Sequence, residues 1–174
     1  EVEMSVCDPR YKASGDHTLI SLDPGKRHAG VAVWRVTSSP GRWLCELRAA
    51  HLVQHTNRIA EAVRETVEPL VQGREVWAVE RMQRYRGKLA KDRALDALES
   101  MLLDLRGAKP RGAGWVSYPP RVWKGQVAKR AHHMRIVSKL TDSEMTILGK
   151  HQADKWDAVA LGLFALGRVG KGGV

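Results

Sequence analysis

The sequence predicts a single α/β domain built on a mixed five-stranded sheet with helices on its faces. Five short apolar runs bounded by turn residues are typical of strands, and amphipathic or nearly all-apolar stretches between and after them are typical of helices. Short turns join the first three runs, which favours antiparallel pairing, whereas the later runs are reached through helices, which favours strands parallel to the first. A chain of 174 residues is long enough to bury one core.

The domain is expected to span residues 18–168, after a loose N-terminal tail over residues 1–17 and before a flexible basic tail over residues 169–174. Strands are predicted at 17–23, 29–36, 43–53, 75–80 and 114–118. Helices are predicted at 57–70 with Asn57 as its N-cap, at 92–106 and at 152–168, and the basic segment 119–140 is expected to be helical in part.

Charge is the most informative bulk property. Lys and Arg number 29 against 19 Asp and Glu, which gives a net charge of +10. This balance suits a polyanionic partner, with nucleic acid first and an anionic membrane surface a distant second. No apolar run approaches the length of a membrane helix and no signal peptide is evident, so a cytoplasmic protein is expected. Cys7 and Cys45 are far apart in sequence and are expected to be free thiols.

Acidic residues end two of the predicted strands. Asp23 ends the first strand and Glu80 ends the fourth. If both strands run the same way, their carboxylates meet at the carboxyl edge of the sheet, where open α/β sheets bind ligands. Taken alone, Asp23 could be an ordinary turn former and Glu80 a solvated strand end.

Two further acids lie near the start of the last predicted helix. Asp154 and Asp157 are three residues apart and therefore share a face, although either could simply favour the positive end of the helix dipole. The small residues Ala158, Gly162 and Ala165 would let this helix lie close to the sheet. Such packing would bring both Asp residues beside the strand ends.

Four converging carboxylates repel one another and need a counter-ion. All-oxygen donors favour Mg²⁺ or Mn²⁺ over zinc, and two such ions can activate water for phosphodiester cleavage. We therefore predict that Asp23, Glu80, Asp154 and Asp157 are catalytic residues and metal ligands for two ions. His151, one turn before Asp154, is a secondary catalytic candidate.

Basic residues cluster in two segments that should flank these acids. Lys124 and Lys129 are expected to position DNA phosphates. The other DNA-binding candidates are Arg130, Arg135, Arg84, Tyr85, Arg86 and Lys88. A solvated basic face is the alternative interpretation of these residues.

Four motifs, in their order and spacing, resemble the RuvC-type Holliday-junction resolvases. They are D-P-G-x-x-x-x-G from Asp23, A-V-E ending at Glu80, P-x-x-V-x-K ending at Lys124, and D-x-x-D-A-x-A-L from Asp154. The resemblance spans about residues 18–168, and the segment P-P-R-V-W-K-G-Q-V-x-K looks most like the shorter phage-like members.

The resemblance implies an RNase H-like fold and a homodimer that resolves four-way DNA junctions by paired symmetric nicks with Mg²⁺ or Mn²⁺, leaving 5′-phosphate and 3′-hydroxyl ends. The setting would be a bacterial cell or a phage-infected host. Asp23 would bridge both metals, Glu80 would hold one and Asp157 would be a ligand, while Asp154 matches a position that is Asp or His among relatives. Relatives carry an aromatic wedge after the Glu80 position; Tyr85 could stack on a base or be a surface side chain.

Other functions remain open on the same residues. The chain could be an RNase H-like nuclease acting on other branched DNA or on RNA-containing substrates, or a catalytically silent module that binds branched DNA. An actin-like ATPase is disfavoured because the chain lacks a duplicated domain and further Gly-rich phosphate loops.

Overall fold

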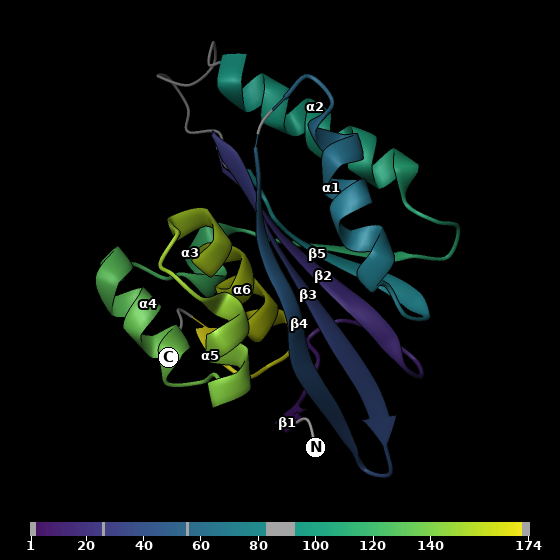
Figure 1. Cartoon of the computed structure of the whole chain (residues 1–174), viewed down its shortest axis with the longest axis vertical. Coiled ribbons are helices and arrows are strands. Elements are labelled where there is room, and N and C mark those ends of the chain that lie inside the picture. The colour runs from purple at the N-terminus through teal and green to yellow at the C-terminus, as the bar shows by residue number, and fades with distance from the viewer. Residues whose placement is uncertain (1–2, 26, 55, 83–92, 172–174) are drawn as a thin grey trace.

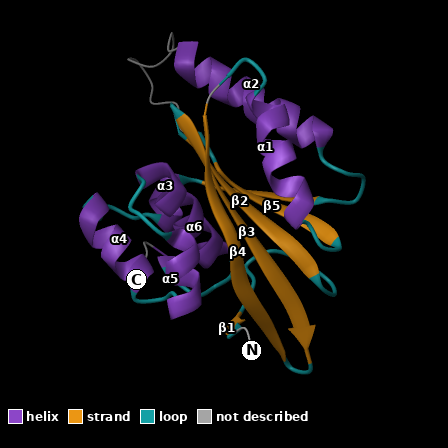
Figure 2. Ribbon diagram, viewed as in Figure 1, coloured by secondary structure: helices purple, strands orange, loops and turns teal. Residues whose placement is uncertain are grey.

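A six-stranded mixed sheet lies between two layers of helices in the computed structural model, which describes residues 3–25, 27–54, 56–82 and 93–171 (Figures 1 and 2). The strand order is β1-β4-β3-β2-β5-β6. The strands are β1 (Ser5–Cys7), β2 (His17–Pro24), β3 (His28–Ser39), β4 (Arg42–Gln54), β5 (Arg74–Glu80) and β6 (Gly114–Tyr118). The strands β2, β3 and β4 pair antiparallel, and β5 and β6 extend the sheet parallel to β2.

Helices cover both faces of this sheet. One layer holds α1 (Ile59–Val67), the 3₁₀ turn η1 (Glu68–Leu70) and α2 (Arg93–Ala108). The other holds α3 (Pro120–Trp123), α4 (Lys129–Val137), α5 (Asp142–Leu148) and α6 (Ala153–Ala165), as Figure 2 shows. The predicted mixed α/β architecture is thus confirmed. Among the described residues, no helix has both the length and the apolar character needed to cross a membrane.

The sixth strand comes from the segment that the sequence predicted to be a loose tail. Ser5 of β1 pairs with Cys45 of β4, the amide of Asp8 donates to the carbonyl of Leu166 at 2.9 Å, and the Arg10 guanidinium donates to the carbonyl of Phe164 at 2.9 Å. A strand of three residues has too little apolar pattern to be recognised, and its pairing with β4 decides its conformation. The five-strand prediction was therefore one strand short.

Helix boundaries differ from the predictions at the ends. Helix α1 begins at Ile59 with Arg58 at the N-cap, so the prediction of Asn57 as N-cap was wrong. The predicted last helix ends at Ala165 rather than 168. The sequence also left α5 unassigned, although Thr141 and Glu144 form a capping box at its start.

Alternation along the strands divides the core into two clusters, one on each face of the sheet. Ile20 and Leu22 of β2 pack with α1 and α2, whereas Leu19 lies in the cluster that contains α6. Since side chains alternate between faces, Ser21 and Asp23 lie on the α6 side with Leu19. The predicted free thiols Cys7 and Cys45 are both unbridged and lie in the α6 cluster.

Helix α6 lies unusually close to the sheet because glycines remove side chains at the contacts. A Cβ on Gly162 would lie 2.2 Å from Nε1 of Trp34, and one on Gly30 would lie 1.8 Å from the backbone oxygen of Asp154. The hydroxyl of Ser21 donates to the carbonyl of Ala158 at 2.7 Å across the same contact. The close packing that the small residues predicted is present at Gly162 and Ala158.

Replacing Gly162 with Ala should destabilise the protein by about 1–3 kcal/mol, because the added methyl overlaps the indole of Trp34 and forces the helix outward. Gly107→Ala is the matched control: it lies in α2 with nothing within 4 Å of its Cβ position. The control should stabilise the protein by roughly 0.5–1 kcal/mol. Chemical denaturation measures both, and equal stability of the two variants would contradict this packing.

Candidate active site

Two acids end neighbouring parallel strands at the same edge of the sheet. The paired register of β2 and β5 ends with Leu22 opposite Val79, so Asp23 and Glu80 are the next residues on the two strands. Val79 belongs to the core cluster that packs against α1 and α2. Because side chains alternate between the two faces of a strand, the side chain of Glu80, the last residue of β5, lies on the α6 face like that of Asp23. The parallel register of β2 and β5 therefore places these two strand ends side by side, as the sequence predicted.

Helix α6 brings the other two acids to this edge. The backbone of Asp154 lies against Gly30, the cross-strand neighbour of Asp23, and its carboxylate lies 2.7 Å from the position of a Gly25 Cβ. Asp157 is buried one turn further along α6. Asp23 interacts electrostatically with Glu80, Asp157 and Asp154, so the four predicted acids do converge.

A lysine lies between two of these carboxylates. Nζ of Lys124 is 3.2 Å from Oε2 of Glu80 and 3.0 Å from Oδ2 of Asp157. Lys124 directly follows the short helix α3, whose Trp123 is fully buried and anchors the turn. The ammonium shows that the gap between Glu80 and Asp157 accepts a cation.

Burial and neighbouring charge set the protonation of the acids. Burial, then repulsion by Glu80, raises the pKa of Asp23 well above its ordinary value. Burial likewise raises the pKa of Glu80, although Lys124 opposes the shift. The carboxylates are therefore costly in the folded protein without additional positive charge.

The pKa of Asp157 shifts in the opposite direction, below its ordinary value. Burial pushes its pKa upward, but Lys124 and the hydrogen bond from His133 outweigh burial, and the pKa is lowered. Burial disfavours the charged form of Lys124, yet the surrounding carboxylates raise its pKa above the ordinary value. Lys124 and Asp157 are thus a charged pair at neutral pH.

The donor set suits a hard cation, although the arrangement is not a closed metal cage. Among the described residues, no three His, Cys, Asp or Glu side chains lie close enough together to hold a metal ion. The Lys124 ammonium lies between Glu80 and Asp157 and pairs with both. The four carboxylates still fit Mg²⁺ or Mn²⁺ by chemistry, since their oxygens are hard donors whose mutual repulsion a divalent ion would relieve.

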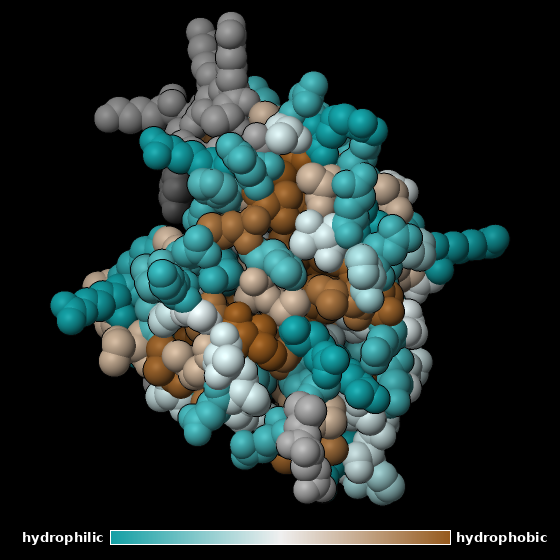
Figure 3. Space-filling view, in the orientation of Figure 1, coloured by the Kyte–Doolittle hydropathy of each residue, from teal (hydrophilic) through white to brown (hydrophobic). Residues whose placement is uncertain are grey.

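The predicted phosphate-binding residues differ in their distance from the acids. Lys129, at the start of α4, is 3.8 Å from Oδ2 of Asp157 and its side chain is 57% exposed. Arg130 is exposed on the same helix and Arg135 is partly buried there. Figure 3 shows that hydrophilic side chains cover most of one face of the molecule, with apolar patches between them. The candidates Arg84, Tyr85, Arg86 and Lys88 lie outside the described residues.

Sequence reasoning missed one residue of this site. Nε2 of His133 on α4 lies 3.0 Å from Oδ1 of Asp157, and its Nδ1 lies 2.7 Å from Nε2 of His151, the secondary candidate. Lys129 and His133 are four residues apart and both reach Asp157, because positions i and i+4 share a helix face. The four-residue spacing of Lys129 and His133 can be seen in the sequence, but the sequence does not show that this helix face packs against Asp157.

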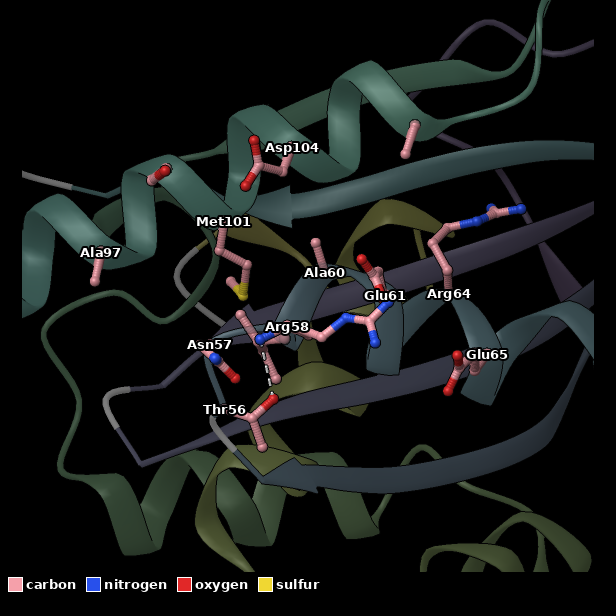
Figure 4. Close-up of a pocket in the computed structure, with 13 residues that line it drawn as sticks. Thr56, Asn57, Arg58, Ala60, Glu61, Arg64, Glu65, Ala97, Met101 and Asp104 are labelled. Carbon is pink, nitrogen blue, oxygen red and sulfur yellow. Dashed lines mark hydrogen bonds and ion pairs between the residues drawn. The ribbon is translucent and has the colours of Figure 1, made fainter.

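A separate cavity of about 660 Å³ lies between α1 and α2, and none of the four predicted acids lines it (Figure 4). Of its basic side chains, Arg58 pairs with Glu61, and Arg64 pairs with Glu75 of β5. Thr56 accepts a hydrogen bond from the backbone of Arg58 at its mouth. The acidic side chains that line it, Glu61, Glu65 and Asp104, come from α1 and α2, so this cavity is separate from the edge of the sheet where the four predicted acids lie.

The fold is shared with solved Holliday-junction resolvases. RuvC from Thermus thermophilus superposes with a TM-score of 0.53 at 22% identity, covering 84% of this chain and 91% of that one. The fowlpox virus Holliday junction resolvase superposes with a TM-score of 0.56 at 16% identity, covering 86% and 97%. These similarities establish an RNase H-like fold. No protein-family model matches the chain, and no curated protein matches its sequence.

Two of the similar structures contain DNA. RuvC from T. thermophilus in complex with a Holliday junction substrate superposes with a TM-score of 0.50 at 19% identity, covering 84% of this chain and 90% of that one. A fowlpox virus resolvase is also solved with its substrate Holliday junction DNA. At these identities the likeness concerns the fold.

The Asp23→Asn variant should be more stable than the wild type when divalent ions are chelated at neutral pH. Folding raises the pKa of Asp23, so its charge costs stability that grows as pH rises above about 4, the ordinary pKa of Asp, toward the folded value. In a protein of this size each kcal/mol relieved adds about 2–4 °C to Tm.

Thermal unfolding in EDTA at pH 7 and at pH 4 measures this difference. The advantage of the variant should shrink at pH 4, where the wild-type carboxyl is protonated in the folded state and about half protonated in the unfolded state. Asp104→Asn, at an exposed position of α2, is the control and should change stability by less than about 0.5 kcal/mol. A variant less stable than the wild type at pH 7 would contradict the electrostatic strain at Asp23.

Proposed function

We propose that this protein is a metal-dependent, structure-selective DNA endonuclease that resolves four-way junctions by paired symmetric nicks. The observation that carries the proposal is the convergence of Asp23, Glu80, Asp154 and Asp157 at one edge of an RNase H-like sheet. Solved structures with this fold include resolvases in complex with Holliday junction DNA. The relation to phage-like members stays a prediction from the Pro119–Lys129 segment.

Asp23, Glu80, Asp154 and Asp157 would hold two Mg²⁺ or Mn²⁺ ions. Such ions supply a water of lowered pKa and stabilise the charge that develops on the leaving 3′ oxygen. Divalent ions would compete with Lys124 for Glu80 and Asp157, because all are cations drawn to the same carboxylates. Asp23 contributes a rigid, buried carboxylate from the end of β2, which limits reorganisation during the reaction.

Basic side chains beside the acids would bind the DNA backbone. Lys129 is exposed and near Asp157, and Arg130 follows it on α4, so both can reach a phosphate held at the acid edge. Paired nicks on opposite strands require two such sites, so the proposal includes a homodimer. The net charge of +10 favours association with any DNA and makes binding dependent on salt.

Cleavage of an immobile four-way junction, mapped on all four strands, tests the proposal. The wild type with Mg²⁺ should produce symmetric paired nicks with 5′-phosphate ends. Asp23→Asn should retain junction binding but lose about 10³-fold in rate, since metal stabilisation of the transition state is worth several kcal/mol. Asp104→Asn should cut like the wild type. Normal cutting by Asp23→Asn would overturn the site assignment.

The alternatives give different results in the same assay. Preference for an RNA–DNA hybrid over the junction in direct competition would indicate an RNase H-type enzyme, and unpaired or off-centre cuts would indicate a nuclease for other branched DNA. Junction binding without Mn²⁺ binding in calorimetry would indicate a silent binding module.

Lys129→Ala should weaken junction binding to a similar extent for all junction sequences. Loss of one phosphate contact should reduce the slope of log affinity against log salt concentration by about 1. Lys109→Ala is the control, because Lys109 donates to the carbonyl of Ala113 next to the start of β6, at the opposite end of the sheet. Fluorescence anisotropy at several salt concentrations measures both, and identical slopes would contradict a phosphate contact at Lys129.

A further inference from the structure

A chain of three side chains runs from the acid edge to the protein surface. Nε2 of His133 is 3.0 Å from Oδ1 of Asp157, and Nδ1 of His133 is 2.7 Å from Nε2 of His151. His133 is buried, whereas His151 is exposed just before α6. The first link joins α4 to α6, and the second joins α4 to the segment that leads into α6.

Hydrogen-bond chemistry fixes the direction of this chain. An ionised carboxylate only accepts, so His133 donates its Nε2–H to Asp157. In a neutral His133 the other nitrogen, Nδ1, is then an acceptor, and His151 donates its Nε2–H to it. His151 thus selects the tautomer of His133 that can hold Asp157.

Aromatic packing holds both imidazoles in place. The ring centroid of Trp156 lies 5.4 Å from that of His133 and 4.7 Å from that of His151. The centroids of the two imidazoles are 4.8 Å apart. Trp156 directly precedes Asp157 on α6, so the same helix turn carries the carboxylate and the ring that clamps its partner.

The two oxygens of Asp157 have separate partners. Oδ1 is held by His133, and Oδ2 is approached by Lys124 and Lys129. A carboxylate oriented in this way presents Oδ2 toward the cationic side of the site. Groups outside the coordination sphere orient metal ligands in this manner, and their loss typically costs about 10–100-fold in metal affinity or activity.

We propose that His133, with its tautomer set by His151, is a positioning residue that orients Asp157 so that Oδ2 faces a divalent ion. The inference rests on the proposed function, since it assigns Asp157 as a ligand. Neither histidine contacts the reacting atoms in this proposal. Both act through the orientation of Asp157.

Titration of the full-length protein with Mn²⁺ in a calorimeter tests the proposal without DNA. His133→Ala should weaken Mn²⁺ binding about 10–100-fold, and His133→Gln, which keeps a donor near the Nε2 position, should recover part of the loss. His151→Phe keeps a ring against Trp156 but removes the donor, and it should weaken binding by less than His133→Ala.

His17→Gln is the matched control for loss of a buried histidine. His17 is buried at the far end of β2, where its ring bonds to the hydroxyl of Tyr11 and the carbonyl of Gly15, each at 2.9 Å. This control should lower Tm without changing Mn²⁺ affinity. Raising the Mn²⁺ concentration should restore junction cleavage by His133→Ala toward the wild-type rate, which a folding defect would not allow.

The histidine tautomers supply an independent readout. Long-range ¹H–¹⁵N spectra of the metal-free wild type should show His133 with its proton on Nε2, and His151→Phe should reduce that preference. Wild-type Mn²⁺ affinity in His133→Ala, or a proton on Nδ1 of His133, would overturn this inference while leaving the nuclease proposal intact. A wild type that binds no Mn²⁺ would overturn both, so the two failures are distinguishable.

Discussion

The close approach of α6 to the sheet is the constraint on which the rest of the site depends. Asp154 and Asp157 reach the ends of β2 and β5 only because Gly30 and Gly162 leave no side chain between helix and strands. The Ser21 hydroxyl ties the helix to β2 at Ala158, one residue beyond Asp157. Interiors pack at near-crystalline density, so a shift of one methyl group at these contacts would move the carboxylates as well as the core.

Packing alone leaves the acid edge electrostatically strained. Asp23 is buried among like charges, and the Lys124 ammonium lies between Glu80 and Asp157. The ammonium groups of Lys124 and Lys129 offset only part of the repulsion among four carboxylates. The same feature that costs folding free energy gives the site its affinity for cations, which is the usual compromise between stability and function at active sites.

The two helical layers differ in the residues that they place against the sheet. The face with α1 and α2 supplies a second apolar core and a cavity that contains none of the four predicted acids. The other face carries α3, α4 and α6, and every described contact to the acids from a basic residue or histidine comes from this side. The solved resolvases share this architecture, and two of those structures contain junction DNA.

Local pattern was sufficient for the strands from β2 to β6, for the mixed pairing and for the expectation that the four acids lie near one another, because periodicity, short turns and strand-end carboxylates can be recognised in the sequence. It was insufficient for β1, whose three residues are a strand only through pairing with β4, and for the N-cap of α1, where Arg58 takes the place expected of Asn57. Local pattern did not predict that Lys124 lies between two acids, because Lys124 and Glu80 are 44 positions apart in the sequence. It did not predict the hydrogen bonds from Asp157 through His133 to His151 either, because these residues meet only when α4 packs beside α6. The sequence by itself determined which residue types and elements are present; only the tertiary structure decided which charges neutralise each other, because Coulombic and hydrogen-bond energies depend on distances that packing sets.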